Sequence, residues 1–203
     1  LIFEKTLGPE AKEVANALFQ MGKCKFLLEE YNSSKEYYNQ ALKIRLKYFG
    51  SVHPDVAQTY INNGRNYFRT GEYRRAIEYF QKALDISLNL KDLDQTYLYE
   101  SYQNLGNSFS KIDEYDMAIQ NHTKALEISI DAYGSSDTKV AESYLSLCGC
   151  YNDKGEYDKA IDFCMKGLKI QQTILKKDHP DFANTYRKLS NSFNYKGELA
   201  LAR

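Results

Sequence analysis

The sequence predicts an all-α fold built from tandem antiparallel helix pairs, and three observations support this prediction. Small residues recur every 42 residues from Gly22 to Ser190, and each repeat contains two apolar stripes with helical spacing. The 203 residues include only three prolines and no tryptophan, but 18 tyrosines. A period of this length is the signature of a repeat architecture, in which neighbouring units bury each other's apolar faces.

The 42-residue step holds in several registers at once. The small-residue series is Gly22, Gly64, Gly106, Cys148 and Ser190. Tyrosine follows the same step from Tyr31 to Tyr157 and from Tyr60 to Tyr186. The step predicts four complete units at about 9–50, 51–92, 93–134 and 135–176, and a partial fifth at 177–203 whose second helix has barely begun. The first seven residues resemble the tail of a preceding second helix, so we expect a single solenoid over 1–203 that is a fragment of a longer array.

Each unit divides into two helical patterns, which the second unit illustrates. Val56, Tyr60 and Tyr67 share one face of a first helix, and Gly71 breaks it. A second apolar stripe then runs from Ala76 to Leu88. Because both stripes have the period of an α-helix, each unit should fold as a helix–turn–helix.

Two His-Pro-Asp triplets, at 53–55 and 179–181, fall at the same point of the repeat. Proline suits the first turn of a helix because its missing N–H would be unpaired there anyway. Asp in that turn complements the helix dipole. We therefore interpret both triplets as helix starts and not as a chemical motif.

The cysteines fit neither a zinc pattern nor a small disulfide scaffold. They are Cys24, Cys148, Cys150 and Cys164. Cys148 holds the small-residue position, and Cys164 and His122 hold the position of Phe80, so we expect all three in the core. We interpret the cysteines as reduced thiols of an intracellular protein.

The overall composition excludes several classes of function. The 27 basic and 27 acidic side chains give zero net charge, which argues against a nucleic-acid binder and a polybasic membrane surface. No apolar run approaches the roughly 18 residues needed to span a bilayer, and no signal-peptide core opens the chain. The sequence has no phosphate-binding loop, zinc-protease motif or nucleophile elbow. We expect no enzyme, no cofactor, no metal, no nucleic acid and no membrane insertion.

One stretch of the third unit resembles the tetratricopeptide repeat pattern. The matching residues are Tyr102, Leu105, Gly106, Phe109, Ala118 and Ala125. The standard unit has about 34 residues, so this one is longer by about one turn in each helix. With linker phrases such as Phe49-Gly50, the chain resembles the long-repeat subclass of kinesin light chains and nephrocystin-3-like proteins. The resemblance implies a right-handed superhelical solenoid of antiparallel helix pairs, whose first helices line a concave groove.

The ligand-facing positions of that family fall on the first helix of each unit. Carried over to this sequence, the candidate partner-binding residues are Phe19, Lys23, Phe26, Asn62, Arg65, Arg69, Asn104, Asn107, Lys111 and Arg187. Cations beside apolar side chains suit a peptide with an acidic residue and a bulky apolar anchor. Asn62 and Asn104 repeat in register, and an amide can both donate to and accept from a peptide backbone.

These expectations describe a protein–protein interaction scaffold that binds a partner peptide or helix in its groove. Two alternatives remain open. One is a structural component packed into a large cytoskeletal or ciliary assembly. The other is a regulatory repeat module attached to an effector domain outside this chain. The family resemblance implies a cytoplasmic location, with cytoskeletal or ciliary association.

Overall fold

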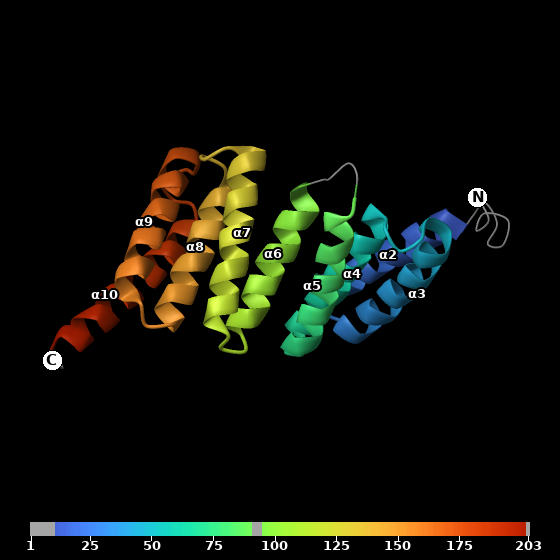
Figure 1. The fold of residues 1–203 in the computed structure, drawn as a ribbon, viewed down its shortest axis with the longest axis horizontal. Coiled ribbons are helices and arrows are strands. Elements are labelled where there is room, and N and C mark those ends of the chain that lie inside the picture. Colours follow the sequence, from blue (N-terminus) through green and yellow to red (C-terminus); the bar gives the residue numbers. More distant parts are fainter. Residues whose placement is uncertain (1–10, 91–94, 202–203) are drawn as a thin grey trace. The chain divides into compact units, whose positions relative to one another are not determined.

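The computed structural model describes residues 11–90 and 95–201, with side chains up to Gly197. Over these residues every regular element is an α-helix, and nine helices follow one another along the chain (Figure 1). They are α2 (Ala11–Leu27), α3 (Tyr31–Phe49), α4 (Pro54–Arg69), α5 (Tyr73–Leu88), α6 (Gln95–Ser110), α7 (Tyr115–Tyr133), α8 (Thr138–Asp153), α9 (Tyr157–Ile174) and α10 (Asp181–Leu201). The predicted all-α helical repeat is confirmed.

The chain divides into two compact units, Leu1–Ser108 and Phe109–Arg203, which we call the N-unit and the C-unit. In the N-unit, α2 packs against α3 and α4 against α5; in the C-unit, α8 packs against α9. A single solenoid over the whole chain stays a prediction. The predicted helix tail at residues 1–7 lies outside the described residues.

The two helices of a pair are joined by a turn that contains one residue in the left-handed backbone conformation. Its φ is 60° at Glu29, 80° at Gly71, 61° at Asp113 and 83° at Gly155. Consecutive members of this series are one repeat step apart. Glycine adopts this conformation without a Cβ clash, which explains two of the four residues.

The fifth position of that series, Gly197, has no such turn. Helix α10 continues through it to Leu201, so the expected break and the start of a second helix are not seen. In the N-unit, the turn at Gly71 is stabilised because α5, a helix of 16 residues, packs back on α4.

Inside two pairs of the N-unit, an aromatic ring lies over a glycine. A Cβ added to Gly22 would lie 2.7 Å from Tyr38 Cδ1, and one added to Gly64 would lie 2.5 Å from Phe80 Cε1. Both rings are fully buried. The small residue therefore lets the two helices approach closely enough to bury the ring.

In the pair α8–α9, Cys148 and Cys164 occupy the positions of Gly64 and Phe80. Both are in the core, as expected, but they form a disulfide with their Cα atoms 5.2 Å apart. The prediction of reduced thiols is therefore wrong for these two cysteines. The spacing of the cysteines did not predict the bond, because its two sulfurs lie on facing helices and 16 residues apart in the sequence. The equivalent positions in the N-unit are also in contact, as Gly22 with Tyr38 and Gly64 with Phe80. Cys24 and Cys150 are free.

The His-Pro-Asp triplets do start helices, and the histidine supplies the cap. His53 Nδ1 accepts a hydrogen bond from Asp55 N at 3.1 Å, and His179 Nδ1 accepts one from Asp181 N at 3.2 Å. Asp137, which holds the same repeat position before α8, accepts from Lys139 N at 2.8 Å. Each bond satisfies a backbone N–H that the first turn of a helix leaves without an intrahelical partner.

Candidate functional site

In the N-unit, the first helices α2, α4 and α6 carry most of the predicted partner-binding residues. Arg65 Nη2 on α4 lies 3.1 Å from Glu100 Oε2 on α6. Arg69 Nη2, also on α4, lies 3.4 Å from Glu29 Oε1 in the turn after α2. These ion pairs connect three successive first helices along one side of the N-unit. We call the residues on it the first-helix face: Lys23, Asn62, Arg65, Arg69, Asn104 and Asn107.

Asn62 and Asn104 adopt the same side-chain arrangement. Asn62 Nδ2 donates to the carbonyl oxygen of Gln58 at 2.9 Å, and Asn104 Nδ2 donates to that of Glu100 at 2.7 Å. Each amide is thus oriented by its own helix, and both side chains are half-buried. The bond uses one of the two amide N–H groups, so the second N–H and the amide oxygen can still bind a peptide backbone.

The two arginines form ion pairs that water reaches. The side chains of Arg65 and Glu100 are 37% and 32% exposed, and those of Arg69 and Glu29 are 51% and 72% exposed. Ion pairs of this kind contribute only about 0–1 kcal/mol. A carboxylate of a partner can therefore replace either glutamate on its arginine at little cost.

Glu29 is a residue that sequence reasoning missed. It carries the left-handed turn after α2, where Gly71 stands one repeat later. The sequence did contain a signal, because Glu29 stands at a repeat position whose left-handed backbone favours glycine. Tyr31 was missed as well, although its ring lies 5.6 Å from the guanidinium carbon of Arg69.

The predicted aromatic residues separate into two environments. Phe19 is 6% exposed, and its ring lies 5.2 Å from that of Tyr38 and beneath the guanidinium of Arg45 at 4.4 Å. Phe19 is thus a core residue and not part of the first-helix face. Phe26 is half-buried, with its ring edge-on to Tyr31 at 5.6 Å. Lys23 and Asn107 are exposed.

The C-unit carries the two remaining predicted residues. Lys111 and Arg187 are exposed, and Arg187 Nη2 donates to Asn184 Oδ1 at 2.9 Å. The repeat position of Asn62 is held here by Ser146 and by Lys188, and Lys188 Nζ donates to the carbonyl oxygen of Leu145 at 2.7 Å. Burial lowers the pKa of Lys188. The paired asparagines are therefore a feature of the N-unit.

Burial shifts the pKa values of two titratable groups in the C-unit, Cys150 and His122. Burial raises the pKa of Cys150 to about 11, so its nucleophilic thiolate is scarce at neutral pH. Burial lowers the pKa of His122 to about 3, which keeps the imidazole neutral. The described ranges contain no group of three or more His, Cys, Asp or Glu side chains placed to hold a metal ion.

Within residues 11–90 and 95–201, no helix combines the length and apolarity needed to cross a bilayer.

Comparison with known protein families finds two models described as tetratricopeptide repeat. One matches residues 13–89 and 55–131, and the other matches residues 140–181. A search of curated protein sequences finds no significant match.

Several solved structures share the fold. BtubC (BKLC) from P. vanneervenii matches with a TM-score of 0.81 and 19% identity, over 96% of this chain and 77% of that one. A Podosopora anserina protein with nearly identical kinesin light chain-type repeats matches with a TM-score of 0.78 and 17% identity, over 93% and 89%. The apo form of RapI matches with a TM-score of 0.79 and 19% identity, over 93% and 66%. At these identities the likeness shows the fold alone.

Proposed function

The chain belongs to the tetratricopeptide repeat family, whose repeats form protein-interaction scaffolds, and we propose that its first-helix face binds an extended segment of a partner protein. The segment carries an acidic side chain beside a bulky apolar one. The kinesin light chain-like type of the repeat agrees with such a role.

The observation that carries this proposal is the matched arrangement of Asn62 and Asn104. Each amide is fixed by a bond to the carbonyl four residues earlier in its own helix. A fixed amide loses less conformational entropy when it binds. Two such amides, one repeat apart, offer the same donor and acceptor to a peptide backbone that crosses both helices.

The preference for an acidic side chain in the partner rests on Arg65 and Arg69, the cations beside these amides. Arg65 follows Asn62 by three residues and thus lies on the same side of α4. Arg69 lies one further turn along. Because water reaches their glutamate partners, half-buried Glu100 and exposed Glu29, the arginines can exchange them for a carboxylate of the segment.

The apolar preference rests on two aromatic residues near those cations. Phe26 and Phe68 are half-buried, and each packs edge-on against the tyrosine that begins the next helix, at 5.6 Å from Tyr31 and 5.3 Å from Tyr73. Their accessible edges give a bulky side chain of the partner a surface to contact.

The test is selection of displayed 12-residue peptides on the full chain, followed by affinity measurement. We expect the selected peptides to combine Asp or Glu with an aromatic or large aliphatic residue. The double variant Asn62→Ala/Asn104→Ala should bind them about tenfold or more weakly, since each lost hydrogen bond contributes about 0.5–1.5 kcal/mol and about 1.4 kcal/mol is tenfold in affinity.

A matched control exists at the second helices, with Asn89 directly after the last residue of α5 and Asn121 within α7. Asn89 Nδ2 donates to Asp85 O at 2.7 Å and Asn121 Nδ2 to Met117 O at 2.8 Å, the same bond to the residue four positions earlier. Asn89→Ala/Asn121→Ala should bind the peptides as the unaltered chain does. Normal binding by the Asn62/Asn104 variant, or an equal loss in the control, would contradict the proposal. The second outcome would favour a structural role for the second helices.

A further inference from the structure

The junction between α3 and α4 in the N-unit is lined by polar side chains. Thr59, Asn63 and Asn66 lie at i, i+4 and i+7 on α4, so they share one side of this helix, and all three are fully buried. Asn63 Nδ2 donates to Asn39 Oδ1 on α3 at 3.2 Å, and Asn66 Nδ2 donates to Ser34 Oγ on α3 at 3.0 Å. We call this junction the polar seam and define it by Ser34, Asn39, Arg45, Thr59, Asn63 and Asn66.

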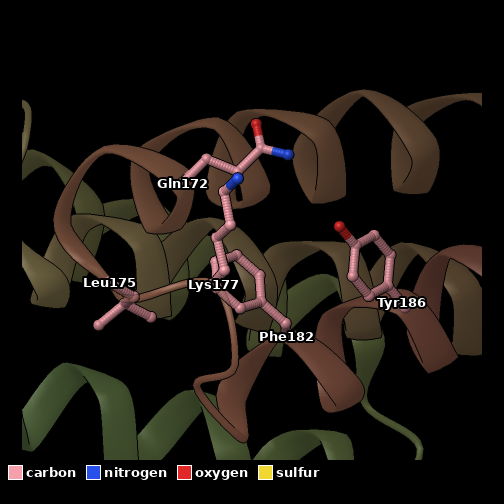
Figure 2. Close-up of a pocket in the computed structure, with 5 residues that line it drawn as sticks. All are labelled: Gln172, Leu175, Lys177, Phe182 and Tyr186. Carbon is pink, nitrogen blue, oxygen red and sulfur yellow. The ribbon is translucent and has the colours of Figure 1, made fainter.

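The other repeats have an apolar residue at the position of Asn63. Leu105 on α6, Leu147 on α8 and Leu189 on α10 stand one, two and three steps later, and each is buried. At the junction of α9 with α10, Leu189 belongs to an apolar cluster that includes Phe182. Figure 2 shows Phe182 there, with Leu175 lining the same hollow of about 320 Å³. Asn63 thus departs from the repeat at a position that otherwise contributes apolar packing.

Three buried polar atoms of the seam have no hydrogen-bond partner among the described residues: Asn63 Oδ1, Asn66 Oδ1 and Arg45 Nε. Each of these atoms either bonds to water that enters the seam or stays unpaired, and an unpaired buried group loses its hydration without compensation. A leucine at position 63 would instead gain free energy by burying apolar surface. The closed seam is therefore less stable than an equivalent junction with leucine.

The two ends of the seam are held differently. At the end next to the linker 50–53, Arg45 Nη1 on α3 donates to Asp55 O and to Thr59 Oγ1, each at 2.8 Å. At the other end lies the bond between Asn66 and Ser34. Two ion pairs also cross the seam at that end, both at 3.4 Å: Arg69 with Glu29, and Lys35 with Glu72. Ion pairs that water reaches contribute little, so an opening motion would turn about the end at Arg45 and separate the end at Asn66.

We propose that the polar seam is a hinge at which the pair α2–α3 swings away from α4, and that a partner bound on the first-helix face holds the hinge closed. The residues of this face lie on both sides of the seam, with Lys23 on α2 and with Asn62 and Arg65 on α4. A segment that contacts both helices binds the closed form more tightly than the open one, so its binding shifts the population towards the closed form. The role of the partner rests on the proposed function, whereas the hinge itself does not.

Thiol labelling measures the opening of the seam. Asn66→Cys places a thiol at the end that should open, at the repeat position where the natural, buried Cys150 stands on α8. Ala83→Cys places one in the pair α4–α5, where Ala83 is fully buried. Iodoacetamide alkylates a buried thiol only while its surroundings are open, and mass spectrometry of the digested chain gives the rate at each thiol. We expect the thiol at position 66 to react at least about tenfold faster than those at positions 83 and 150.

The cause of the opening is tested by giving the seam the residue of the other repeats. In the Asn66→Cys chain, Asn63→Leu should slow alkylation at position 66 about tenfold, because it replaces an unpaired polar atom by apolar packing. Asn63→Val makes the same apolar change with a smaller side chain, which covers the case in which leucine overfills the site. Asn39 is exposed and can bond to water once its partner is removed. The shared background cancels the loss of the bond between Asn66 and Ser34.

The link to the partner is tested with a peptide selected on the full chain. Once bound, it should slow alkylation at position 66 and leave the rate at position 83 unchanged. If no peptide is selected, the proposed function fails, but the rates measured without peptide still test the hinge.

Three outcomes would overturn the inference. Alkylation at position 66 that is no faster than at positions 83 and 150 would contradict the hinge. A fast rate that neither Asn63→Leu nor Asn63→Val lowers would show that the polarity of the seam is not the cause. A fast rate that a bound peptide leaves unchanged would contradict the role of the partner.

Discussion

Gly64 determines how closely α4 and α5 approach, because any side chain there meets the ring of Phe80. We predict that Gly64→Ala lowers the free energy of unfolding by about 1–3 kcal/mol, the usual effect of overpacking a core. Urea denaturation measures this. Gly197→Ala is the control: Gly197 lies within α10 with no atom within 4 Å of an added Cβ. It should raise stability by about 0.5–1 kcal/mol, since alanine favours a helix. Equal effects of the two substitutions would refute the close-approach explanation.

His122 makes the stability of the C-unit depend on pH. Burial lowers its pKa to about 3 in the folded chain, whereas an exposed histidine has a pKa near 6.5. Between these values the unfolded chain binds a proton that the folded chain does not. The free energy of unfolding therefore falls as the pH is lowered from about 6.5 towards 3.

The variant His122→Phe, which introduces the residue found at position 80, tests this dependence. Between pH 7 and pH 5, the unaltered chain should lose about 2 kcal/mol more than the variant, because one pKa unit corresponds to about 1.4 kcal/mol. Urea denaturation at both pH values measures the difference. If both chains lose the same free energy, His122 is not the group responsible.

At the scale of helices, the disulfide between α8 and α9 takes the place of the contact between Gly64 and the ring of Phe80 in the pair α4–α5. Cys148 and Cys164 are 16 residues apart, and a crosslink that closes a loop of this size contributes about 3 kcal/mol. We predict that a reductant lowers the thermal stability of the chain. The variant Cys148→Gly/Cys164→Phe should recover much of that stability and lose its response to the reductant. A variant that melts below the reduced chain would show that these positions are not equivalent to Gly64 and Phe80.

Arg45 links α3 to its neighbours on both sides. Its Nη1 donates to the carbonyl oxygen of Asp55 and to Thr59 Oγ1, each at 2.8 Å, and its Nη2 donates to Asn16 Oδ1 at 3.0 Å. The side chain is 3% exposed. Arg45→Ala should lower the free energy of unfolding by about 3 kcal/mol, the sum of three such bonds. Lys43→Ala, at an exposed position of the same helix, should change it by less than about 0.5 kcal/mol. Similar effects of both substitutions would contradict this role of Arg45.

Across the whole molecule, the 42-residue step predicted where helices lie, where small residues stand and which rings are buried. The reason is that each helix pair packs in the same way, so residues of the same size are needed at equivalent positions of each unit. Phe80 and His122 are buried as their shared position indicates. The step could not predict contacts that depart from the repeat. Arg45 stands where Ser87 and Ser129 stand in the next units, and its guanidinium covers Phe19.

The candidate site was predictable only in part, for a related reason. The positions of Asn62 and Asn104 followed from the family resemblance, but their orientation depends on which backbone carbonyl each amide reaches. The pairing of Arg69 with Glu29 depends on a turn that brings together residues 40 positions apart. Such pairings depend on side-chain reach between helices, which a periodic pattern in one sequence does not record.

We propose that the first-helix face of the N-unit binds a partner segment through Asn62 and Asn104. The most direct measurement follows the side-chain amide signals of asparagine by NMR while a selected acidic and aromatic peptide is added. We expect the signals of Asn62 and Asn104 to shift together and to saturate at one dissociation constant, while those of Asn89 and Asn121 do not move. Shifts confined to Asn89 and Asn121, or saturation of binding with Asn62 and Asn104 unmoved, would contradict it.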